Sequence, residues 1–270
     1  EIFSNLVINK ASGTVTLLDD IEVETQLDMQ NGPLDLNART AQIDNNATTG
    51  IIRTSGYIIS ENTANTAQVL WQMGSTGGAH VFPFGTSAGT YIPFTFDATA
   101  GSPGNVTLAT YGTPPDNLPW PTTPTNVTNL LSTIGLTPDN RDATVDRFWQ
   151  ITVSGSPTAT LTFAYAAAEL PVAPYNAPNS MVAQRYDSGT NFWEAPLPGQ
   201  SAVAYAVTVP GVTTFSPWTL TNTLSPLPVE LLWFKGNRSG DDVLLSWETA
   251  SEINNDFFTI LHLKEAGIDF

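Results

Sequence analysis

Residues 225–260 read SPLPVELLWFKGNRSGDDVLLSWETASEINNDFFTI, and this stretch decides how the end of the chain can fold. Pro226 and Pro228 each fix a backbone φ angle and favour extended geometry in the preceding residue, so they predict a linker near residues 222–228. Alternating apolar residues begin directly after it, which is typical of a β-strand. The chain is therefore predicted to divide near residue 225.

Three apolar runs after the linker have the alternation of β-strands. The first begins at Val229, a turn follows at residues 236–242, the second begins at Val243, and the third covers residues 257–263. Three strands cannot close an immunoglobulin- or fibronectin-III-like sandwich, which needs about seven. Residues 225–270 are therefore predicted to be a linker and an incomplete module of this type. Its uncovered apolar face is predicted to be an assembly surface made by Val229, Leu231, Trp233, Val243, Leu245 and Trp247.

Several of these residues also carry a family resemblance. Residues 227–234 (LPVELLWF) and 243–258 (VLLSWETASEINNDFF) resemble the module that precedes the C-terminal sorting domain in many proteins exported by the type IX secretion system of Bacteroidota. The stretches HVFPFG (80–85), DRFWQI (146–151) and TFSPWTL (214–220) are similar to the surface region that often lies upstream of that module. The resemblance implies export to the surface of a Gram-negative cell. It implies no particular activity, because the same module follows adhesins and enzymes alike.

The composition excludes several classes of partner. Of the 270 residues only 13% are charged, against about a quarter in a typical soluble domain. The net charge of −16 argues against nucleic acid and anionic membrane surfaces as partners. The sequence has no run of about 18 apolar residues, so no membrane-spanning helix is predicted. It has no cysteine, which excludes disulfides and thiolate chemistry.

The distribution of cations favours association between β-sheets. No Lys or Arg lies between Arg53 and Arg141. Natural sheets often protect their exposed edges with charged residues, Lys above all. A β-rich region without them lacks one barrier to edge-to-edge pairing, although loops could cover the edges instead.

Residues 1–52 have a short internal rhythm of apolar-x-apolar pairs, repeated every six to nine residues. Such short, evenly spaced strands predict a parallel β-helix or β-roll in which each pair points inward. An antiparallel meander with tight turns is the alternative. The pairs are Leu6 and Ile8, Val15 and Leu17, Ile21 and Val23, Leu27 and Met29, Leu34 and Leu36, and Ala41 and Ile43.

Residues 53–224 contain longer β-branched and aromatic runs bounded by Gly, Pro or Ser. Turn signals recur at intervals of about ten residues, which predicts a jelly-roll-like β-sandwich. Residues 112–125 contain five prolines and are predicted to be an extended loop, and residues 126–136 a short helix. The fold class predicted for the whole chain is all-β with little helix.

The search for catalytic chemistry finds no convincing constellation. The two histidines, His80 and His262, lie outside any zinc or triad motif, and no phosphate-binding loop is present. Paired carboxylates could serve a glycosidase, and the candidate acids are Asp146, Glu169, Asp187 and Glu194. Most acids here adjoin turn residues, where they complete turns. We therefore predict that the chain is not an enzyme.

Two weaker patterns point to ligands. An oxygen-rich loop could hold Ca²⁺ through Asp139, Asn140, Asp142 and Asp146, although it is not an EF-hand, and a solvated turn is the alternative. Trp120, Trp193 and Trp218 lie outside obvious alternating strands and could stack on surface sugars. Core packing is the more common role of tryptophan.

The sequence thus predicts a non-enzymatic, secreted cell-surface protein with a structural or adhesive role. It is expected to assemble into a filament when a neighbouring copy completes the module after residue 225 by β-strand addition. Later residues of a longer polypeptide could complete the module instead. The alternative function is that of a carbohydrate-binding accessory region of a larger secreted protein.

Overall fold

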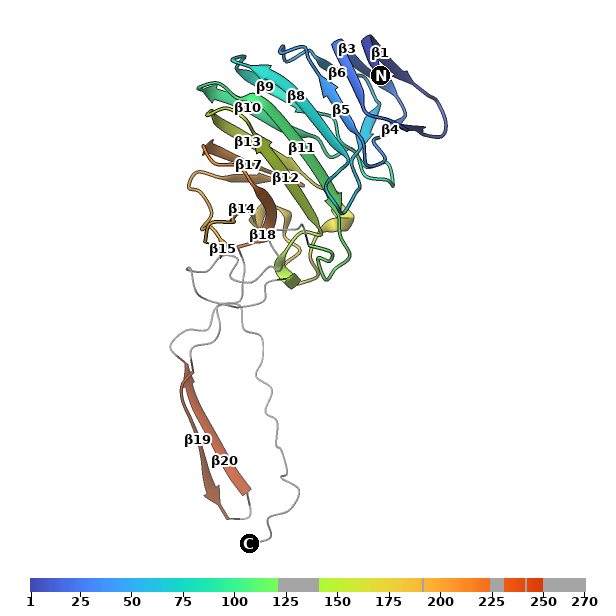
Figure 1. Cartoon of the computed structure of the whole chain (residues 1–270). Coiled ribbons are helices and arrows are strands. Elements are labelled where there is room, and N and C mark those ends of the chain that lie inside the picture. The colour runs from blue at the N-terminus through green and yellow to red at the C-terminus, as the bar shows by residue number, and fades with distance from the viewer. Residues whose placement is uncertain (121–140, 191, 224–230, 241, 250–270) are drawn as a thin grey trace. The chain divides into compact units, whose positions relative to one another are not determined.

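The computed structural model describes residues 1–120, 141–190, 192–223, 231–240 and 242–249. The chain is all-β, with 55% strand and 4% helix. It divides into two compact units, Glu1–Thr223 and Leu224–Phe270 (Figure 1). No helix in the described ranges is long and apolar enough to cross a membrane.

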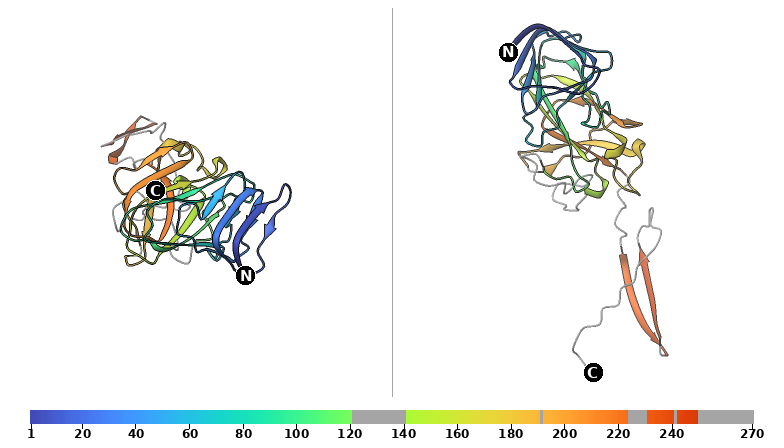
Figure 2. Two further views of the ribbon diagram at one scale, coloured as in Figure 1. Left: turned by 90° about the horizontal axis from the view of Figure 1, so that it is seen from above. Right: turned by 90° about the vertical axis from the view of Figure 1, so that its right-hand side faces the viewer.

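The first unit begins with strands that pair in parallel. β1 (Ile2–Asn9), β3 (Ile21–Asn31), β5 (Thr40–Ile43) and β8 (Gln68–Gly74) are consecutive neighbours in one sheet, and β6 (Ile51–Arg53) also pairs with β3. Each pass of the chain therefore adds a strand beside the strand of the previous pass. Figure 2 shows these strands, in blue to cyan, side by side at one end of the unit.

A second, smaller parallel sheet is formed by the same passes of the chain. It contains β2 (Val15–Thr16), β4 (Pro33–Asp35) and β7 (Tyr57–Ile59), and Phe84 extends it by a parallel bridge to Ile58. The apolar pairs of the sequence point inward between the two sheets. The prediction of inward-facing pairs is confirmed by the burial of Ile8, Leu17, Ile21, Val23, Leu27, Met29, Leu34, Leu36, Ala41 and Ile43.

The larger sheet continues without a break into antiparallel strands. From β8 onward its order is β11 (Gly104–Gly112), β12 (Arg147–Val153), β18 (Pro217–Asn222), β14 (Met181–Asp187) and β15 (Phe192–Trp193). The ten-stranded sheet thus runs through the boundary predicted between residues 52 and 53. One hydrophobic core serves both regions.

A five-stranded antiparallel sheet packs against this half and makes a sandwich. Its order is β16 (Ser201–Val203), β17 (Ala206–Val212), β13 (Thr158–Ala164), β10 (Phe94–Ala100) and β9 (Gly78–Phe82). Aromatic rings fill the space between the sheets: Phe163 of β13 contacts both Trp149 and Trp218, with ring centroids 5.3 and 5.4 Å apart. The described helices are single 3₁₀ turns: η1 (Arg141–Ala143), η2 (Ala167–Glu169) and η3 (Pro178–Ser180).

The described part of the second unit is one antiparallel hairpin. β19 (Leu231–Ser239) pairs with β20 (Asp242–Thr249), and Phe234 stacks on Trp247 with ring centroids 6.4 Å apart. The third strand predicted at residues 257–263 and the helix predicted at residues 126–136 lie outside the described residues.

Candidate functional site

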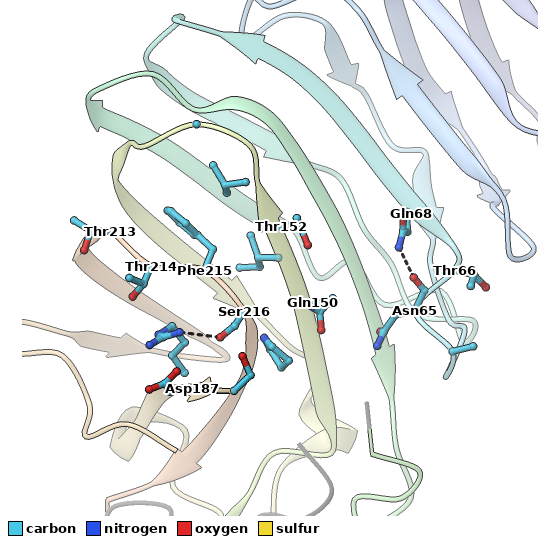
Figure 3. A pocket seen from close by; sticks show the side chains of 17 residues that line it. Asn65, Thr66, Gln68, Gln150, Thr152, Asp187, Thr213, Thr214, Phe215 and Ser216 are labelled. Atoms are coloured by element: carbon cyan, nitrogen blue, oxygen red, sulfur yellow. Dashed lines mark hydrogen bonds between the residues drawn. The ribbon is translucent and has the colours of Figure 1, made fainter. Parts of the chain in front are cut away.

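A polar groove opens where the short pairing between β12 and β18 ends. β18 pairs with β12 only at Trp149–Trp218 and Gln150–Pro217. Beyond Gln150 the rest of β12 borders residues 213–216, which lead from β17 into β18, and the two segments are not paired there. A groove of about 870 Å³ lies at this opening (Figure 3).

Side chains with unused hydrogen-bonding capacity line the groove. The amide of Gln150 and the hydroxyl of Thr152 are on β12, and neither makes a hydrogen bond to any described residue. Asn65 comes from the loop before β8, and its Oδ1 atom is buried without a partner among the described residues. The Nε2 atom of Gln68 donates to the backbone carbonyl of Asn65 at 2.5 Å and holds this loop against β8. The groove therefore presents amide and hydroxyl groups ready to bind a polar ligand.

The charged side chains at the groove are one cation and two carboxylates. Arg185 lines it, but its Nε donates to Glu194 at 2.7 Å and its Nη1 to Ser216 Oγ at 3.2 Å. Asp187 lies nearby, and hydrogen bonds from the Gly189 amide and the Thr190 hydroxyl lower the pKa of its carboxyl. One carboxylate thus remains without a cation of its own, so the groove is not a site for anions.

One aromatic ring provides an apolar part of the groove wall. Phe215 is half-buried, and its ring lies 5.6 Å from that of Phe96 in the core. The core fixes the ring, since Phe96 is fully buried. The groove therefore combines a fixed aromatic surface with polar side chains.

A buried ion cluster lies at the opposite end of β12. Arg147 is 1% exposed, and its Nη2 is 2.6 Å from Glu61 Oε1 and 2.5 Å from Glu169 Oε1. Its Nη1 donates to Thr110 Oγ1 at 3.1 Å, and the Thr110 hydroxyl donates to the carbonyl of Phe148 at 2.8 Å. Burial opposes the charge on the guanidinium, but its two carboxylate partners outweigh burial and raise the pKa of Arg147. This cluster ties β12 to the loop that carries Glu61 and to the 3₁₀ turn that carries Glu169.

Three of the four candidate acids of a glycosidase are held by partners within the protein. Glu169 holds Arg147, Glu194 holds Arg185, and Asp187 accepts hydrogen bonds within its own turn. Asp146 differs, because burial and then the neighbouring Glu169 and Asp116 carboxylates raise its pKa to about 7. His80 is buried, with Nδ1 3.1 Å from the Gly78 carbonyl and Nε2 3.0 Å from the Asn46 carbonyl.

The predicted calcium loop is described only in part. Asp139 and Asn140 lie outside the described residues. Asp142 is in the 3₁₀ turn η1, and Asp146 is directly before β12. No cluster of three or more His, Cys, Asp or Glu side chains suited to a metal occurs among the residues that the structure describes.

The three tryptophans predicted to stack on sugars do not form an exposed platform. Trp193 and Trp218 are each 1% exposed, which corrects the expectation that their rings face solvent. Pro217 opens a fully buried strand and does not keep Trp218 outside the sheet, while Trp193 pairs with Tyr186 on β14. Trp120 is half-buried and contacts Phe148, with ring centroids 5.2 Å apart.

The structure describes the side chains at four of the six positions of the predicted assembly face, and three of these four share one face of the hairpin. Val229 lies outside the described residues, and only the backbone of Leu231 is described. Val243, Leu245 and Trp247 alternate along β20 and share one face with Phe234 of β19. Trp233 is on the other face, opposite Glu248, and its indole Nε1 donates to Glu248 Oε2 at 2.6 Å. The reason is the register of the hairpin, which pairs Phe234 and not Trp233 with Trp247, so that Trp233 points to the opposite side.

The outermost pass of the parallel strands has an open apolar cavity. The cavity measures about 270 Å³, and its lining includes the inward side chains of Leu6, Ile8, Leu17 and Leu34. Leu18 at its rim is 76% exposed. Within the described residues, β1 has no neighbour on its outer side.

Comparison of the chain with protein-family models, curated proteins and solved structures found no match.

Proposed function

We propose that the chain is a non-enzymatic, secreted cell-surface protein with a structural or adhesive role, which assembles by β-strand addition between copies. In this proposal the parallel strands are a β-helix-like stack, and the hairpin begins an immunoglobulin- or fibronectin-III-like module. The resemblance to type IX secretion cargo supports export. The observation that carries the proposal is the amphipathic hairpin of the second unit.

The hairpin has one apolar face and no second layer among the described residues. Phe234, Leu245 and Trp247 lie together on this face, and Val243 beside them is 65% exposed. A two-stranded hairpin is only marginally stable in water by itself. Its apolar face therefore needs a covering layer.

The open end of the first unit has the chemistry to accept such a hairpin. Apolar side chains surround its cavity, and the edge of β1 can pair with an added strand. The complementarity is that of an apolar face with an apolar cavity and of a hairpin with a free strand edge. Charge does not add to it, because the hairpin carries Asp242 and Glu248 as well as Lys235 and Arg238, while Glu1, Asp19, Asp20, Glu22 and Glu24 belong to the first unit.

A second copy is the occupant that this complementarity favours. The hairpin of one copy would cover the open end of the next. Because the two surfaces differ, the contact is head-to-tail and produces an open filament unless the rotation closes a ring.

Two adjacent leucines provide a matched test. Leu245 is on the apolar face, and Leu244 is on the opposite face and 60% exposed. Leu245→Ser should abolish filaments in electron micrographs and leave a monomer in sedimentation velocity, whereas Leu244→Ser should assemble like the parent. A parent chain that stays monomeric at every concentration would refute assembly between copies. In that case later residues of a longer polypeptide remain as the covering layer.

A second candidate function is carbohydrate binding as an accessory region of a larger secreted protein. The polar groove favours it, because the groove is open, almost uncharged and lined by amides and hydroxyls. This function predicts that columns of immobilised polysaccharide retain the protein. The result does not depend on which residues bind the sugar.

A further inference from the structure

We infer that the groove between β12 and residues 213–217 is a binding site for a neutral oligosaccharide. The inference rests on the second candidate function and assigns it to a place in the fold that none of the three predicted tryptophans occupies. Three features of the groove carry it: its hydrogen-bonding groups, its charge and its shape.

The hydrogen-bonding groups match the hydroxyls of a sugar. The side-chain amide of Gln150 both donates and accepts, as does the hydroxyl of Thr152, and neither is engaged by a described residue. A sugar hydroxyl can donate to the side-chain carbonyl oxygen of Gln150 or accept from its amide nitrogen, so a row of hydroxyls uses Gln150 and Thr152 better than a ligand that only accepts hydrogen bonds.

The charge of the groove selects neutral sugars over acidic ones. Arg185 is already paired with Glu194, and Asp187 keeps its carboxylate because its pKa is lowered. A uronic acid or sulfate group would meet this carboxylate without an available cation. Polyanions are excluded on the same ground.

The shape of the groove suits a chain of sugars. It is open along its length and extends from the loop before β8, across β12, to Ser216 and to Pro217 at the start of β18. Pockets for small ligands are usually enclosed and mainly apolar, with volumes of about 300–1,000 Å³. This groove has a similar volume but an open, polar wall, and Phe215 offers a ring on which the C–H face of a pyranose can pack.

The test measures binding of neutral hexasaccharides to the full chain by isothermal titration calorimetry. The panel contains β-1,4-glucan, β-1,3-glucan, α-1,4-glucan, β-1,4-xylan and β-1,4-mannan fragments, with hexagalacturonate as the acidic counterpart. At least one neutral member should bind with a Kd of about 1 mM or tighter, and hexagalacturonate should not bind. Gln150→Ala and Thr152→Ala should each weaken that binding about threefold to tenfold.

Gln42→Ala is the matched control, since Gln42 is on β5 of the same sheet and outside the groove. This variant should bind like the parent. If a neutral sugar binds and the groove variants bind it equally well, the groove is the wrong site while carbohydrate binding stands. If the protein is retained on no polysaccharide and binds no hexasaccharide, both the inference and the second candidate function fail. Preferential binding of hexagalacturonate would overturn the assignment of a neutral ligand.

Discussion

At the scale of single residues, Arg147 is the side chain on which the sandwich most depends. It is a buried cation between two carboxylates, and removal of one partner from such a pair leaves a buried charge uncompensated. Arg147→Met should therefore lower the free energy of unfolding by about 3–5 kcal/mol, measured by urea denaturation. Arg185→Met is the comparison, because the Glu194 side chain of that pair is 41% exposed and the loss should be about 1 kcal/mol or less. Equal losses would show that burial does not set the strength of the Arg147 cluster.

Asp146, beside Arg147, predicts a pH dependence of stability. Its folded pKa of about 7 lies above the ordinary aspartate value of 3.8, so the folded state holds a proton that the unfolded state releases between these two pH values. The stability contributed by this group is present at low pH and is lost as the pH rises from about 4 to 7. Asp146→Asn should make the protein more stable than the parent at pH 8, with the difference shrinking towards pH 4. Urea denaturation at a series of pH values measures it, and a constant difference would contradict the assignment.

The groove shows what sequence could not predict at this scale. Asn65, Gln150, Asp187 and Phe215 come from four segments that only the sandwich topology brings together. The alternation in DRFWQITV does place Gln150 and Thr152 on the same face of a strand, away from the buried Trp149 and Ile151. That pattern alone does not distinguish a ligand site from an ordinary solvent-exposed face.

At the scale of elements, local sequence patterns predicted the strands correctly where neighbouring strands are also close in sequence, as in residues 1–52. The apolar pairs of residues 1–52 predicted inward-facing short strands because burial alternates along a strand with period two. The same reasoning misjudged Trp218, which was expected outside any obvious alternating strand and available to a sugar, whereas it is buried in β18, where Pro217 holds the first position that proline tolerates in a strand. β18 pairs with β12 and β14, which are distant in sequence, so no local sequence pattern predicts this pairing.

The corner between β3 and β4 is where the parallel strands are most easily disrupted. Gly32 has a φ of +76°, and a Cβ atom there would lie 2.2 Å from the carbonyl oxygen of Lys10. Gly32→Ala should cost about 1–3 kcal/mol of unfolding free energy from backbone strain, and more from this contact. Gly74→Ala is the control, because its φ is also positive, at +58°, but nothing lies within 4 Å of the added atom. Urea denaturation compares the two variants, and a loss no larger at Gly32 would contradict the steric account.

At the scale of the whole molecule, the shared sheet predicts that the first unit unfolds as one body. The parallel strands and the sandwich share the ten-stranded sheet and one core, so neither can open without exposing the other. Leu34→Ala, in the parallel region, should cost about 2–5 kcal/mol. Trp149 and Trp218 lie in the sandwich, but Trp71 is on β8 and Trp233 and Trp247 are in the hairpin. With Phe at these three other positions, the tryptophan fluorescence reports on the other end of the sheet. In urea, the fluorescence transition of this variant should move together with its far-UV circular dichroism transition. If the dichroism falls first while the tryptophan signal keeps its midpoint, the parallel strands unfold independently, and the unbroken sheet does not make the two regions cooperative.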